Sequence, residues 1–158
     1  MSSVRLLIAL GLILFAQNAT AVCHPCLTTL SIERTVQQAS VIAVVSNNDR
    51  NSSAYLEAGP EVVNLTVEKL LRGAIDNEYP LTVHSWYGEC PFGVRMGVGD
   101  HAIVLLQEVT DITTGEWDGT YKLVESGCSQ GQLDIRGDTM RLNGKNITIG
   151  EFEHEYLR

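Results

Sequence analysis

The stretch Val41-Ile42-Ala43-Val44-Val45 consists only of apolar side chains, most of them β-branched. A second apolar run, Ile103-Val104-Leu105-Leu106, follows in the later half of the chain. Short continuous runs rich in β-branched residues are typical of strands that are buried in a sheet. The two runs therefore predict two buried strands.

Further segments show the period-two pattern of strands that have one buried face. In residues 63–67 and 81–85, apolar or small residues alternate with polar or larger ones. Such alternation predicts half-buried strands. Another strand is predicted at residues 121–125, and residues 133–135 and 140–142 are predicted to form a hairpin.

Two short helices are predicted outside the strand-rich region. Ser31 can cap an early helix, and Phe152 and Tyr156 lie four residues apart on one face of a late one. The polar, turn-rich stretches 46–60 and 110–119 are predicted as loops.

This order of elements favours an all-β fold. About six or seven short strands are expected, and they do not alternate with helices as a parallel sheet would require. A small antiparallel barrel closes such strands without leaving exposed edges.

The bulk composition describes an acidic protein. The chain has 158 residues, 44% of them hydrophobic and 19% charged, and a formal net charge of −8. Because no cluster of lysine and arginine stands out, we expect no binding to nucleic acid or to anionic membranes. The length suits one domain, expected over residues 22–158.

Residues 1–21 have the layout of a secretory signal peptide. Arg5 precedes an apolar run at residues 6–16, and Ala19-Thr20-Ala21 provides small residues for cleavage. The run is too short for a membrane-spanning helix. We therefore expect a secreted, extracellular protein (periplasmic if the source is bacterial) with no membrane insertion of the mature chain.

Four cysteines follow this segment: Cys23, Cys26, Cys90 and Cys128. An even number in an exported chain predicts two disulfides, and three pairings are possible. A zinc site would need a second closely spaced ligand pair, which Cys90 and Cys128 do not form. A thiol–disulfide oxidoreductase using Cys23 and Cys26 is an alternative, although such motifs normally begin a helix after a buried strand.

No catalytic motif is recognisable, and we expect a protein that is not an enzyme and needs no cofactor or metal of its own. The chain has no phosphate-binding loop, metal-binding histidine pair or nucleophile elbow. The histidines His84, His101 and His154 stand apart from one another in the sequence.

Short motifs add two further possibilities. Asn51, Asn64 and Asn146 are glycosylation acceptors if the source is eukaryotic. Arg136-Gly137-Asp138 matches the integrin-binding tripeptide, whereas the alternative interpretation is an ordinary hairpin turn.

Several features follow one another in a particular order along the mature chain. They are the early cysteine pair, Ala39-Ser40-Val41-Ile42-Ala43-Val44-Val45, Asn64-Leu65-Thr66-Val67-Glu68-Lys69-Leu70-Leu71-Arg72-Gly73, Cys90 among glycines, Gly99-Asp100-His101-Ala102-Ile103-Val104-Leu105-Leu106 and a lone Cys128. In this order they resemble the netrin-module superfamily, in particular the tissue inhibitors of metalloproteinases. The resemblance implies a closed five-stranded OB-fold Greek-key barrel with short flanking helices, and the disulfides Cys23–Cys90 and Cys26–Cys128.

The resemblance also implies a function, the inhibition of an extracellular zinc metalloendopeptidase without catalysis. In the family, the first cysteine of the mature chain chelates the protease's zinc, and the next residue enters the specificity pocket. The corresponding ridge here comprises Cys23, His24, Pro25, Trp86, Tyr87, Gly88 and Glu89. Besides the oxidoreductase, the other alternative is a structural extracellular adaptor that shares only the fold.

Overall fold

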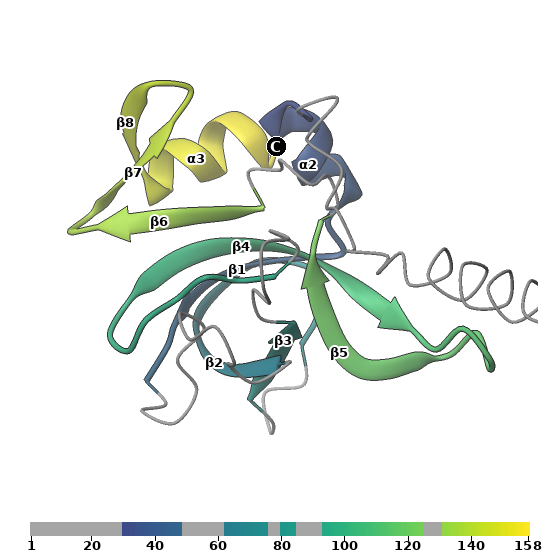
Figure 1. The fold of residues 1–158 in the computed structure, drawn as a ribbon. Helices are drawn as coiled ribbons and strands as arrows, with labels where there is room; N and C mark the ends of the chain where they lie inside the picture. The colour runs from purple at the N-terminus through teal and green to yellow at the C-terminus, as the bar shows by residue number, and fades with distance from the viewer. Residues whose placement is uncertain (1–29, 49–61, 76–79, 85–92, 125–130) are drawn as a thin grey trace, which may run out of the picture.

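The computed structural model describes residues 30–48, 62–75, 80–84, 93–124 and 131–158 (Figure 1). The first helix and the barrel strands are α2 (Ile32–Gln38), β1 (Val41–Ser46), β2 (Val62–Arg72), β3 (Leu81–His84), β4 (His101–Thr110) and β5 (Trp117–Leu123). The later elements are β6 (Gln132–Arg136), β7 (Thr139–Leu142), β8 (Lys145–Thr148) and α3 (Ile149–Tyr156). The segment predicted to be a signal peptide lies outside the described residues.

Strands β1 to β5 close into a barrel. Their order around it is β1-β2-β3-β5-β4, and β4 pairs back with β1 over the register Val41↔Leu106 to Ser46↔His101. All of these pairings are antiparallel except that of β3 with β5, which is parallel at Val83↔Tyr121. The prediction of an all-β, OB-like five-stranded barrel with two short flanking helices is confirmed.

The two apolar runs are buried on both faces because each separates two hydrophobic cores. Successive strand side chains point to opposite faces. Val41, Ala43 and Val45 therefore contribute to the core inside the barrel, whereas Ile42 and Val44 contribute to a second core outside it. Strand β4 divides its side chains between the two cores in the same way.

The second core is covered by the helices and the last three strands. Figure 1 shows α2, α3 and β6 to β8 together on one side of the barrel. Their apolar side chains meet those of β1 and β4, and the buried members of this layer include Ile32, Leu133, Met140, Leu142 and Phe152. Because β6 also pairs with β4, the covering layer continues the barrel's own sheet.

The helices begin where the sequence provides caps. Ser31 caps α2 by accepting a hydrogen bond from the Arg34 amide. Thr148 and Glu151 form a capping box at the start of α3, in which each side chain satisfies a backbone amide of the other residue. Both predicted helices are therefore confirmed.

The structure corrects the predicted loop boundaries. Strand β4 extends to Thr110 and β5 begins at Trp117, because polar residues continue the pairing of the two strands beyond the core, to Thr110↔Trp117. Ser46 belongs to β1, and Asn47 is also buried, donating from Nδ2 to the Met96 carbonyl over 3.0 Å. Strand β8 was not predicted, because it is mostly polar and only partly buried.

None of the helices within the described ranges combines the length and apolar character needed to cross a membrane.

Gly73, directly after β2, is held in a conformation that suits glycine. Its φ is +90°, and a Cβ atom there would collide with the Ser40 carbonyl oxygen. Gly119 has the same φ of +90° but open space around the missing Cβ. Gly73 therefore combines a backbone requirement with a steric one, and it allows β2 to end against the start of β1.

Replacing Leu105 by alanine should lower the free energy of unfolding by roughly 2–5 kcal/mol. The Leu105 side chain is buried in the second core, and the smaller alanine would leave a cavity in its place. The control is Ile112→Ala, at an exposed position in the β4–β5 turn, which should change stability by less than about 0.5 kcal/mol. Urea titration followed by tryptophan fluorescence would compare them. Equal effects of the two variants would contradict a second core that is integral to the barrel.

Replacing Gly73 by alanine should destabilise the protein more than replacing Gly119. Both variants place a side chain in the left-handed region, at a cost of about 1–2 kcal/mol. Only Gly73→Ala adds the collision with Ser40. Thermal unfolding of both purified variants would show whether the midpoint falls further for Gly73→Ala, and equal midpoints would refute the steric argument.

Candidate functional site

The residues of the predicted ridge and disulfides lie outside the described part of the chain. These residues are Cys23, His24, Pro25, Cys26, Trp86, Tyr87, Gly88, Glu89, Cys90 and Cys128, and Asn51 also lies outside it. The structure does describe the residues that flank each cysteine-bearing segment, and their contacts define the frame of the candidate site.

The segment that contains Cys90 begins and ends at the same point of the barrel. His84 is the last residue of β3, and its carbonyl accepts a hydrogen bond of 2.9 Å from the Val94 amide. Val94 and Met96 are both buried in the barrel core. The two described flanks of the Cys90 segment therefore lie directly alongside each other in the barrel.

The side chain of Gln132 fixes the stretch that follows the Cys90 segment, at Arg95, to the start of β6. Its Oε1 accepts from the Arg95 amide, and its Nε2 donates to the Arg95 carbonyl, both over 2.8 Å. An amide side chain that satisfies both backbone groups of one residue imitates a strand pairing. Residues shortly after Cys90 and shortly after Cys128 are thus joined.

The segment that contains Cys128 is anchored at both of its described ends by Leu105. The Leu105 carbonyl accepts from the Val124 amide over 2.9 Å, and its amide donates to the Gly131 carbonyl over 2.7 Å. In addition, β3 and β5 are parallel neighbours, so His84 and Leu123 both end their strands at the same side of the barrel.

The chain enters the described structure through α2, which packs on the same region. Ile32 and Val36 share the second core with Val124 and Leu133. The Arg72 guanidinium donates to the Val36 carbonyl over 2.8 Å and ties α2 to β2. The described flanks of all three cysteine-bearing segments therefore rest on a connected set of elements: α2, β3, β5 and the start of β6.

A polar chain across β3 and β5 reinforces the parallel pair. The Thr120 hydroxyl donates to Asp118 Oδ1 over 2.7 Å, which leaves its oxygen to accept from His84 Nε2 at 3.2 Å. The hydrogen bond from the Thr120 hydroxyl lowers the pKa of Asp118, and the Thr120 amide and the charge of His84 act in the same direction. The arrangement therefore links β3 to β5 through the Thr120 hydroxyl.

An aromatic pocket beside β3 and β5 was not anticipated from the sequence. It has a volume of about 430 Å³ and is lined by Ile75, Pro80, Leu81, Thr82, Trp117, Gly119 and Tyr121. Trp117 is 48% exposed, and its ring centroid lies 5.3 Å from that of Tyr121. Burial raises the pKa of the Tyr121 hydroxyl, and the charge of Glu108 adds to this effect. The period-two pattern places Tyr121 on the inner face, but the position of Trp117 depends on the extension of β5 beyond the core.

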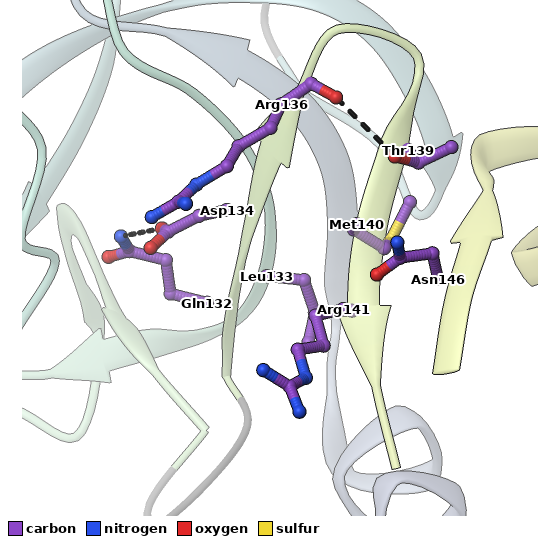
Figure 2. Close-up of a pocket in the computed structure, with 8 residues that line it drawn as sticks. All are labelled: Gln132, Leu133, Asp134, Arg136, Thr139, Met140, Arg141 and Asn146. Atoms are coloured by element: carbon purple, nitrogen blue, oxygen red, sulfur yellow. Dashed lines mark hydrogen bonds between the residues drawn. The ribbon is translucent and has the colours of Figure 1, made fainter. Parts of the chain in front are cut away.

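A second pocket lies on the outward face of β6, β7 and β8 and has a volume of about 500 Å³ (Figure 2). Its lining is mostly polar and consists of Gln132, Leu133, Asp134, Arg136, Thr139, Met140, Arg141 and Asn146. Asp134 accepts from Gln132 Nε2 over 2.6 Å. Within the described ranges, the guanidinium groups of Arg136 and Arg141 make no hydrogen bond or ion pair.

Two of the predicted glycosylation acceptors are described, and both are exposed. Asn64 on β2 accepts from the Thr82 hydroxyl through Oδ1, which leaves its amide nitrogen available. Asn146 lines the pocket on β6 to β8. Thr148, the third residue of the Asn146 sequon, is engaged in the cap of α3.

The histidines within the described ranges lie on different elements of the fold. His101 lies on β4 with Nδ1 3.1 Å from Glu68 Oε1, at an exposed position, and His154 lies on α3. Among the residues that the structure describes, no three histidine, aspartate, glutamate or cysteine side chains gather in a group that could hold a metal ion.

Comparison of the chain with protein-family models, with curated proteins and with solved structures finds no match.

Replacing Gln132 by alanine should loosen residues 94–96, which follow the Cys90 segment. Loss of two hydrogen bonds to Arg95, each contributing about 0.5–1.5 kcal/mol, should raise amide exchange at residues 94–96 by roughly tenfold or more. The matched control, Gln107→Ala, removes a bond to the Gln38 carbonyl elsewhere and should leave this region unchanged. Hydrogen exchange followed by mass spectrometry would measure the exchange of residues 94–96 in both variants. Unaltered exchange in Gln132→Ala would contradict the proposed clamp, which is the pair of hydrogen bonds between Gln132 and Arg95.

Proposed function

We propose that this protein is an extracellular, non-catalytic binding domain that inhibits a zinc metalloendopeptidase through an N-terminal ridge. The ridge consists of residues 23–25 beside residues 86–89, tied to the barrel by the disulfides Cys23–Cys90 and Cys26–Cys128. The proposal follows the resemblance to the tissue inhibitors of metalloproteinases in the netrin-module superfamily.

The observation that carries the proposal is the convergence of the flanking residues. The parallel ends of β3 and β5, the clamp between Gln132 and Arg95, and the packing of α2 against Val124 bring the described neighbours of all the cysteines to connected elements. Long-range disulfides between these segments are compatible with that arrangement. A barrel that is anchored on both sides of the Cys90 and Cys128 segments, and that α2 joins to the N-terminal segment, provides a rigid base for a binding ridge.

Two disulfides of this kind would also hold the N-terminal segment in one conformation. Each would close a long loop, and the loss of chain entropy in the unfolded state is worth on the order of 4–5 kcal/mol per disulfide. A ridge ordered before binding loses less conformational entropy on association, which strengthens inhibition.

The chemistry of inhibition depends on the first residue of the mature chain. Catalytic zinc sites keep one coordination position open. A free α-amino group on Cys23 could take that position in the protease, and the Cys23 carbonyl oxygen could bind beside it as the zinc expands to five ligands. If Val22 precedes Cys23, the nitrogen is an amide and cannot serve as that ligand.

Inhibition requires removal of the signal peptide after Val22, one residue beyond the predicted cleavage after Ala21. In that case, peptide mapping of the secreted protein should find a mature terminus at Cys23 and the pairs Cys23–Cys90 and Cys26–Cys128. Such a protein should inhibit zinc endopeptidases at micromolar concentration or below. The matched control carries one additional alanine before Cys23, which removes the amine without altering the barrel, and it should lose inhibition by at least tenfold.

The same measurements separate the alternative functions. A readily reduced Cys23–Cys26 bond, together with thiol–disulfide exchange activity, would contradict the inhibitor function and support an oxidoreductase. A Val22 terminus together with fully active endopeptidases would overturn inhibition and leave a structural adaptor.

A further inference from the structure

The β6–β7 hairpin carries the tripeptide Arg136-Gly137-Asp138 at its tip. Arg136 pairs with Thr139, so only Gly137 and Asp138 connect the strands. Gly137 has φ of +67°, as the first position of a type II′ hairpin turn requires. The backbone of the tripeptide is therefore set by a two-residue turn and not by a long loop.

The root of this hairpin is fixed although its tip is free. Leu133, Met140 and Leu142 are buried in the second core, whereas Arg136, Gly137 and Asp138 are all exposed. Figure 1 shows the β6–β7 tip at the outer end of the covering layer, pointing away from α2. A partner could reach the tripeptide without displacing any described element, and little conformational entropy would be lost on binding.

Both charged side chains of the tripeptide are available to a partner. Among the described residues, the Arg136 guanidinium and the Asp138 carboxylate make no hydrogen bond or ion pair, with each other or with a neighbour. Figure 2 shows the Arg136 side chain lying along the outward face in the direction of Asp134, whose own oxygen accepts from Gln132. The hairpin therefore presents one unpaired cation and one unpaired anion at a fixed backbone spacing.

We propose that this tip is a second binding surface, which docks on a cell-surface receptor of the integrin type. The receptor would offer a divalent cation with an open coordination position and, beside it, an acidic pocket. The Asp138 carboxylate would complete the coordination of the cation, since carboxylate oxygen is a preferred ligand of such ions. The Arg136 guanidinium would form a bidentate pair with a carboxylate of the pocket.

This surface is separate from the proposed inhibitory ridge. It lies on β6 and β7 and uses none of the cysteine-bearing segments, so binding at the tip does not depend on protease inhibition. The overall charge of −8 does not favour docking on acidic surfaces in general. Recognition at the tip would therefore depend on the side chains of Arg136 and Asp138 and not on the overall charge of the protein.

The test measures binding of purified integrin ectodomains to the immobilised mature protein by surface plasmon resonance in buffer containing Mn²⁺. We expect saturable binding that is abolished by EDTA and weakened at least tenfold by Asp138→Glu, which keeps the charge but lengthens the side chain. Arg136→Lys should also weaken binding, because it removes the bidentate geometry. The matched control is Arg141→Lys, an unpaired arginine on the same face, which should bind as the unchanged protein does.

Thermal unfolding of each variant excludes a loss of fold as the reason for weaker binding, since exposed substitutions should leave the midpoint unchanged. Absence of Mn²⁺-dependent binding across the panel of ectodomains would overturn the proposal. Binding that persists in Asp138→Glu or in EDTA would overturn it equally, because the contact would then lie elsewhere on the protein.

Discussion

Burial of β1 and β4 on both faces is the constraint on which the rest of this structure depends. The odd-numbered side chains of Val41–Ser46 that lie inside the barrel need β2, β3 and β5 to exclude water from them. The even-numbered side chains need an equivalent cover outside the barrel. At about 25 cal/mol for each Å² of apolar surface removed from water, neither face could be left exposed without a large loss of stability.

The helices and the last three strands therefore form part of the same folded unit as the barrel. β6 pairs with the first half of β4, β5 pairs with its second half, and the backbone of Leu105 bonds to both Val124 and Gly131 between them. This division of one strand edge between two partners positions the ends of the Cys128 segment. The same arrangement brings Gln132 within reach of Arg95 and thereby connects the Cys90 segment.

The two proposed surfaces rest on parts of this architecture that differ in physical character. At the ends of β3 and β5, the described flanks of the Cys90 and Cys128 segments are held by backbone hydrogen bonds and a buried core. At the tip of β6 and β7, a tight turn exposes opposite charges that make no ion pair within the described part of the chain. The first surface would gain rigidity from disulfides, and the second already has it from the hairpin.

The sequence by itself determined the strands and the barrel class, because continuous apolar runs and period-two alternation are local signals of burial. It also determined the Ser31 cap of the first helix and the hairpin around Gly137, where the residue types match the local backbone. It could not reveal β8, the extension of β5 to Trp117, or the pocket that Trp117 shares with Tyr121, since polar residues continue those strands only through pairing with distant partners. Tertiary structure alone decided how the side chains of residues 41–45 divide between two cores, and that Gln132 bonds to Arg95. The physical reason is that a local sequence pattern indicates that a face is buried but not which distant segment covers it.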